Sequence, residues 1–85
     1  GVYVQGDYAY VVSVNGNRLT IIDTSNPSTP SYVKDYSNPT YMDQPRSIYV
    51  SGKYAYIVSY ISDSLTIIDI SNPLMPTFTG SYKDS

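Results

Sequence analysis

Short hydrophobic runs, separated by turn-forming residues, make up most of this chain. In the second half, β-branched and aromatic residues dominate residues 47–50, 54–59 and 65–70, and a more polar run follows at residues 77–82. Gly52 separates the first two runs, residues 61–64 separate the next two, and Pro73 and Pro76 precede the last. Gly favours turns, and Pro interrupts the hydrogen-bond ladder of a sheet. No run has the period of an amphipathic helix. The pattern predicts four short strands joined by brief turns, which is an antiparallel meander.

The first half of the chain repeats this plan at an offset of 46 residues. Pairing residues 1–39 with residues 47–85 gives 18 identities in 39 positions. A period of roughly 20–50 residues is typical of solenoids, propellers and repeat arrays. We therefore predict two units, residues 1–46 and residues 47–85, of which the first ends in an inter-unit loop at residues 37–46. The strands of the first unit are expected at residues 2–5, 8–13, 18–23 and 31–36.

A four-stranded unit of about 40–50 residues has the size of a β-propeller blade. The alternative is a two-sheet sandwich, in which each strand has one solvated face. Residues 54–58 and 65–68 are apolar on both alternating faces, as expected of a sheet packed between two others. The sequence therefore favours an all-β fold with two four-stranded antiparallel meanders per chain, each of them a β-propeller blade.

Two recurring motifs carry a resemblance to a known family. V-x-G-x-Y-A-Y-[VI] begins at Val4 and again at Val50, and L-T-I-I-D-x-S-N-P-x-x-P begins at Leu19 and again at Leu65. Together they resemble the LVIVD repeat, a propeller-forming repeat of bacterial and archaeal extracellular proteins. The resemblance covers nearly all of the chain and implies a propeller fold and a cell-surface location. It implies no shared catalytic residues.

Composition excludes several classes of function. The net charge is −2 and the five cations are scattered singly, so the chain has no basic stripe for nucleic acid. No apolar run reaches the length of about 18 residues that membrane insertion needs. The absence of cysteine excludes disulfides and thiolate metal sites. Tyrosine supplies 11 residues and glutamate none, a composition that suits an extracellular or cell-surface β-protein.

The Asp-x-Ser-Asn-Pro segments contain the first candidate residues. Asp23 and Asn26, with their copies Asp69 and Asn72, could offer oxygen ligands to calcium. Asp and Asn also accept hydrogen bonds from backbone N–H groups two residues on, which is ordinary turn chemistry. Because the segment recurs in both units, we expect these four residues to be structural turns. We expect no metal and no cofactor.

The Tyr-Ala-Tyr triplets, centred on Ala9 and Ala55, could be stacking platforms for a sugar or a base. They fit better as core, with the rings packed against the next blade and Ala allowing close approach on the other side. The chain has no His, Cys or Glu, so a Ser or Thr nucleophile lacks the usual base. Asp43 and Asp63 could approach each other for acid–base work. We nonetheless predict that the chain is not an enzyme.

One end of the meanders is the candidate binding surface. Connections alternate between the two ends of a meander, so the turn after each second strand and the inter-unit loop share one end, the loop end. Tyr, Met and Arg beside amides form an interface-like composition. The candidate binding residues at the loop end are Asn15, Asn17, Arg18, Tyr41, Met42, Asp43, Gln44, Arg46, Tyr60 and Asp63.

Two blades do not close a propeller ring, so further blades are needed to bury the outward-facing side chains. Other copies of the chain can supply them, with six blades from three chains or eight from four, and so can flanking repeats. Assembly of copies is the favoured expectation. The sequence predicts a non-enzymatic extracellular propeller module that acts as a self-assembling structural, adhesion or protein-interaction scaffold. The alternative is a lectin-like propeller that binds carbohydrate through its tyrosine- and amide-rich loop tips.

Overall fold

The computed structural model describes residues 1–61 and 63–83 of the chain, which form eight strands and no helix. The strands are β1 (Val2–Gln5), β2 (Tyr8–Val12), β3 (Arg18–Asp23), β4 (Ser31–Ser37), β5 (Pro45–Ser51), β6 (Tyr54–Ser59), β7 (Ser64–Asp69) and β8 (Thr77–Lys83). Each predicted strand is present, and its ends lie within two residues of the predicted ones. The prediction of an all-β fold is confirmed. No helix in the described ranges is long and apolar enough to cross a bilayer.

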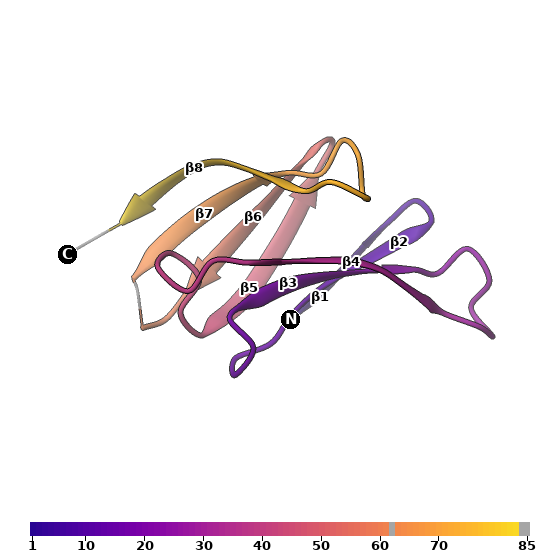
Figure 1. Ribbon diagram of the computed structural model, residues 1–85, viewed down its shortest axis with the longest axis horizontal. Helices are drawn as coiled ribbons and strands as arrows, with labels where there is room; N and C mark the ends of the chain where they lie inside the picture. Colours follow the sequence, from indigo (N-terminus) through magenta and orange to yellow (C-terminus); the bar gives the residue numbers. More distant parts are fainter. Residues whose placement is uncertain (62, 84–85) are drawn as a thin grey trace.

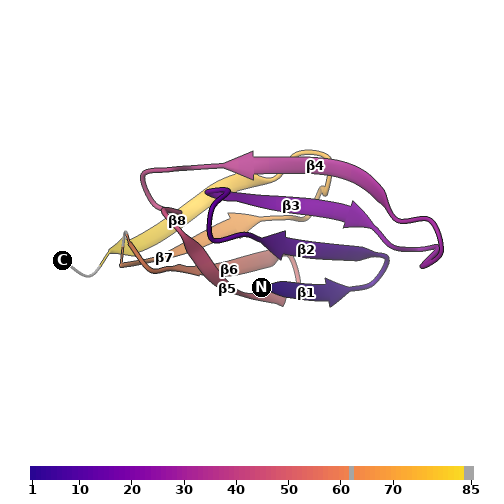
Figure 2. The same ribbon diagram turned by 90° about the horizontal axis from the view of Figure 1, so that it is seen from below.

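The strands form two four-stranded sheets with the orders β1-β2-β3-β4 and β5-β6-β7-β8. Every neighbouring pair is antiparallel, so each sheet is a meander. Figures 1 and 2 show the two sheets stacked on one another, and the first strands of each, β1 and β5, are in contact. The chain thus forms two adjacent propeller blades that are not closed into a ring.

The two blades share their local irregularities. Gly6 and Gly52 occupy the β1–β2 and β5–β6 turns with φ of 62° and 60°, a left-handed conformation that costs glycine little and other residues more. The β3–β4 and β7–β8 pairings shift register at the equivalent steps Ile21/Ile22 and Ile67/Ile68. Such bulges increase the local twist of the outer strands. The sequence repeat is therefore reproduced in backbone geometry.

Each blade has two faces, and the core lies where the two blades meet. We call the face that holds Tyr10, Leu19 and Ile21 the front face of blade 1, and its counterpart with Tyr56, Leu65 and Ile67 the front face of blade 2. The opposite side of each blade is its back face. The front face of blade 1 packs on the back face of blade 2 in a cluster that contains Tyr10, Val12, Leu19, Ile21, Met42, Ile48, Val50, Ala55, Ile57, Ile68 and Ile70.

The front face of blade 2 is open. The sequence predicts that β6 and β7 are buried on both faces, but burial alternates along them, and Tyr56, Leu65 and Ile67 are only half-buried. Val58 and Tyr82 on the same face are 51% and 69% exposed. No third sheet covers this side, so the apolar pattern on it has no partner within the described chain. The back face of blade 1 is likewise open, with Val2 and Val4 exposed.

Candidate functional site

The structure gathers the predicted loop-end segments at one end of the blades. The backbone N–H of Gln44 donates to Asn17 Oδ1 at 3.1 Å. The N–H of Tyr60 donates to the carbonyl of Gln44 at 3.1 Å, and that of Ile61 to the carbonyl of Asp43 at 3.2 Å. The inter-unit loop is therefore tied to the β2–β3 turn of blade 1 and to the β6–β7 turn of blade 2.

Met42 is not the exposed contact residue that the sequence suggests. Its side chain is 0% exposed and belongs to the core cluster between the two blades. Its N–H donates to the carbonyl of Asn38 at 2.7 Å, which folds the loop back on itself. The expectation that Met42 contacts a partner is wrong, because the loop crosses the gap between the sheets and fills it with this side chain.

Tyr41 is held against blade 2. Its carbonyl accepts hydrogen bonds from Ser64 Oγ and from Thr66 Oγ1, the latter at 3.3 Å. Its ring stacks on Phe78 of β8, with centroids 5.5 Å apart. Ser64 and Thr66 are buried polar residues, so these bonds satisfy hydroxyl groups that would otherwise be costly to bury. Tyr41 therefore anchors the inter-unit loop to blade 2.

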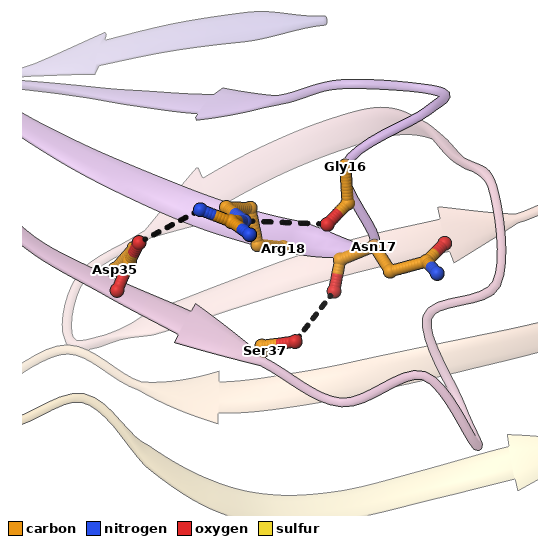
Figure 3. Close-up of polar contacts among 5 residues, drawn as sticks. All are labelled: Gly16, Asn17, Arg18, Asp35 and Ser37. Atoms are coloured by element: carbon orange, nitrogen blue, oxygen red, sulfur yellow. Dashed lines mark hydrogen bonds and ion pairs between the residues drawn. The ribbon is translucent and has the colours of Figure 1, made fainter.

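Arg18 has a local role in blade 1 (Figure 3). Its Nη1 lies 3.2 Å from Asp35 Oδ2 on the neighbouring strand, and its Nε donates to the carbonyl of Gly16 at 3.3 Å. Both side chains of this ion pair are solvent-accessible, so the pair adds little stability. Beside it, Ser37 Oγ donates to the carbonyl of Asn17 at 3.4 Å, while Asn15 is exposed in the turn.

Arg46, Tyr60 and Asp63 surround a hollow on the loop end of blade 2. The Arg46 guanidinium lies 4.5 Å from the centroid of the Tyr60 ring, which is a cation–π contact. Asp63 has a φ of 48°, a conformation that Asp tolerates better than most residues. The hollow measures about 320 Å³ and is lined by Arg46, Val58, Ser59, Tyr60, Asp63, Ser64, Leu65 and Tyr82.

Besides Ser59 and Ser64, three lining residues are absent from the sequence-based candidate list: Val58, Leu65 and Tyr82. Sequence position could have identified them, because they stand 46 residues after Val12, Leu19 and Tyr36. Val12 and Leu19 are buried, and Tyr36 packs against the same cluster.

The Tyr-Ala-Tyr triplets differ in burial although their sequences match. Tyr10 is 3% exposed in the core, and burial raises the pKa of its hydroxyl, with a smaller contribution from the charge of Tyr8. Tyr56 is half-buried on the open front face, and its ring lies edge-on to Tyr54 at 6.4 Å. The first triplet is thus core, and the second presents the same rings at the surface.

The turn aspartates accept backbone hydrogen bonds in both blades. Asp23 Oδ1 accepts from the N–H of Ser25 at 2.9 Å, and Asp69 Oδ1 from that of Ser71 at the same distance. The equivalent asparagines, Asn26 and Asn72, accept from the N–H groups two residues on. These bonds favour the charged carboxylates and lower the pKa of Asp23 and of Asp69 below the usual 3.8.

We expect Asp23→Ala and Asp69→Ala to destabilise the fold modestly at neutral pH. A lowered folded-state pKa gives stability that is present above the unfolded pKa and is lost as the pH falls through the folded-state value. The difference from the wild type should therefore vanish in acid, as measured by thermal unfolding across pH. Asp23→Asn keeps the acceptor oxygen and is the matched control, which should retain most of the stability at neutral pH. A calcium-dependent rise in melting temperature that either alanine variant abolishes would contradict this role.

Comparison with known proteins adds one finding. No curated protein and no solved structure matches the chain. The family model of the LVIVD repeat matches twice, over residues 1–38 and residues 44–84. The two matches follow the two blades, since the first ends after β4 and the second begins one residue before β5. They cover most of the sequence, and the chain therefore belongs to the LVIVD repeat family.

Proposed function

We propose that the chain is a non-enzymatic scaffold module that acts outside the cell by binding further blades of its own kind. Other copies of the chain or flanking repeats supply those blades and close the propeller. The resulting rigid body serves structural, adhesive or protein-interaction roles. The composition supports the extracellular location, since the chain is rich in Tyr, Ser, Thr and Asn and has no Glu.

One observation carries this proposal: the open faces are copies of the buried ones. On the open front face of blade 2, Tyr56, Val58, Leu65 and Ile67 occupy the positions that Tyr10, Val12, Leu19 and Ile21 hold in the buried front face of blade 1. On the open back face of blade 1, Val4, Ala9, Thr20 and Ile22 correspond to Val50, Ala55, Thr66 and Ile68, which are buried. The chain therefore has two open faces, and each corresponds to one of the two faces that pack together between its own blades.

The backbone pattern supports the same interpretation. Corresponding strands have equivalent pairings, because Tyr10 opposes Ile21 and Tyr56 opposes Ile67. The bulge at the outer strand also recurs at the same step. Two surfaces with the same residues on the same backbone geometry can pack in the same way. Burial of these faces would remove apolar side chains from water, which is the main favourable term in association.

The chemistry available in the chain supports a binding role over catalysis. The carboxylates of Asp23 and Asp69 are engaged by backbone N–H groups, and their lowered pKa values make them weak bases near neutral pH. With no His, Cys or Glu, a nucleophile in this chain has no conventional base to activate it.

Carbohydrate binding is the alternative, and one observation favours it. Tyr60 is 59% exposed at the rim of the loop-end hollow, where an aromatic ring beside a carboxylate could receive a sugar. Two contacts weaken this alternative. The Tyr41 ring stacks on Phe78, and the Arg46 guanidinium covers one side of the Tyr60 ring.

We expect the isolated chain to assemble into closed rings of three or four copies. Sedimentation velocity and light scattering over a range of concentrations measure the oligomeric state. Val4→Lys should prevent assembly without unfolding the chain, because Val4 is 60% exposed on the back face of blade 1 and a charge there cannot be buried unpaired.

Ser28→Lys is the matched control for this experiment. Ser28 is exposed in the β3–β4 connection, away from both open faces, so this change should leave the assembly intact. A monomer that unfolds cooperatively at micromolar concentration would overturn self-assembly, and so would assembly that Val4→Lys does not affect.

A further inference from the structure

The contact between blade 1 and the inter-unit loop is a template for a second site. In blade 1 the loop inserts Met42 into the core between the blades. Two residues of blade 1 hold the loop in place. Asn17 accepts at its Oδ1 from the N–H of Gln44, and its carbonyl accepts from the N–H of Asn38. The Tyr36 hydroxyl accepts from Asn38 Nδ2 at 3.2 Å.

Blade 2 has the same receiving groups around the loop-end hollow. Asp63 is the repeat equivalent of Asn17, and Tyr82 is the equivalent of Tyr36. The φ of Asp63 is 48° and that of Asn17 is 52°, so the two residues have the same left-handed backbone. A carboxylate at this position retains the acceptor that binds a backbone N–H, and its charge strengthens the bond.

The apolar part of the hollow is also preserved. Val58 and Leu65, which line it, are the equivalents of the buried Val12 and Leu19. In blade 1 these two residues share a core cluster with Met42. In blade 2 no side chain of the described residues takes the place of Met42, and Val58 is 51% exposed.

We infer that the loop-end hollow of blade 2 is a docking site for a loop of the same chemistry as residues 38–44, brought by a further blade. The incoming segment places an unbranched apolar side chain, Met or a similar residue, against Val58 and Leu65. Its backbone N–H groups donate to the Asp63 carboxylate, and a side-chain amide donates to the Tyr82 hydroxyl. This inference rests on the proposed function: the loop comes with a flanking repeat, because in another copy of the chain Met42 is already buried in that copy's own core.

The rim differs from the corresponding part of blade 1. Tyr60 stands where blade 1 has Val14, and Arg46 lies over the Tyr60 ring. The incoming loop therefore meets a cation and an aromatic ring at the rim.

A synthetic peptide of residues 37–46, capped at both ends, tests the inference on the full chain. We expect it to bind, and in a heteronuclear NMR titration to shift the amide signals of Tyr60, Asp63, Leu65 and Tyr82. A peptide with Ser in place of Met42 should bind roughly tenfold or more weakly, because the buried apolar side chain is lost. Asp63→Ala and Leu65→Lys in the protein should weaken binding to a similar extent.

Asp7→Ala is the matched control for Asp63→Ala. Asp7 lies in the β1–β2 turn, at the opposite end of the blades, so this change should leave peptide affinity unchanged. Equal affinity of the Met and Ser peptides would overturn the inference. So would an oligosaccharide from a glycan array that binds the hollow when the peptide does not.

Sedimentation of the same samples separates this inference from the proposed function. If the chain assembles but the peptide does not bind, the docking site is refuted and the scaffold role stands. If the peptide binds with the expected selectivity but no assembly forms, the docking site is supported and self-assembly is refuted.

Discussion

Met42→Ala is expected to lower the free energy of unfolding by about 2–5 kcal/mol, the usual cost of truncating a fully buried Met, Leu or Ile side chain. Met42 is 0% exposed between the two blades, so its removal leaves a cavity that both sheets line. The cavity would also loosen the inter-unit loop, whose carbonyl at Tyr41 satisfies buried hydroxyl groups of blade 2. Chemical denaturation monitored by circular dichroism measures the effect.

The chain offers its own control for this prediction. Met75 is the other methionine of the sequence and is 65% exposed in the β7–β8 connection. Met75→Ala should change the free energy of unfolding by less than about 0.5 kcal/mol, as surface substitutions usually do. Equal effects of the two changes would contradict the burial of Met42. Mild peroxide treatment gives a second measurement, because Met75 should oxidise before Met42.

Leu19→Ala and Leu65→Ala should have very different effects at low protein concentration although the two residues are repeat equivalents. Leu19 is 0% exposed, so its truncation should cost about 2–5 kcal/mol. Leu65 is half-buried on the open front face, so its truncation in the monomer should cost clearly less. Denaturation curves of both variants, recorded below the concentration at which chains associate, measure the difference.

The same pair tests the proposed assembly at high concentration. Association buries the front face of blade 2, and any partner that binds only the folded state adds stability by mass action. Leu65→Ala should therefore become more destabilising as the concentration rises, while the effect of Leu19→Ala changes little. A concentration-independent difference between the two variants would argue against burial of Leu65 by a second copy.

The sequence was sufficient to predict most of the fold, because the repeat confirms each strand twice. Prolines and glycines at equivalent positions fix the turns, and β-branched runs leave little choice between strand and helix. The loop end could also be predicted, because the connections of a meander alternate between its ends. Asn17 and Gln44 are distant in sequence but hydrogen-bonded in the structure, as this alternation requires.

The burial of Met42 could not be predicted from local sequence. It stands in the longest irregular stretch and is flanked by polar residues, including Asp43 and Gln44, which is the pattern of a solvated loop. Its burial depends on the path of the loop between two sheets, a long-range property that no local pattern encodes. The stacking of Tyr41 on Phe78 has the same origin.

The exposure of β6 and β7 was also beyond local prediction. Their apolar residues on both faces are typical of a sheet that packs against another sheet on each side. Whether the second neighbouring sheet is present cannot be read from the residues of the strand itself. Val12 and Val58 are identical residues in equivalent strands, 2% and 51% exposed respectively. The apolar pattern of a strand therefore predicts the burial that the strand has in a closed propeller. In two blades that are not closed, the observed burial is lower.

The difference between the front and back faces gives any growing assembly a polarity. Within the chain, a front face that carries tyrosines packs on a back face of small and β-branched residues. Copies that repeat this junction meet front to back, and every such junction is head-to-tail. A copy with one blocked face, such as Val4→Lys, still joins through the other and then admits no neighbour beyond it. Such a variant is a terminator, and one copy among three or four is enough to leave a ring unclosed.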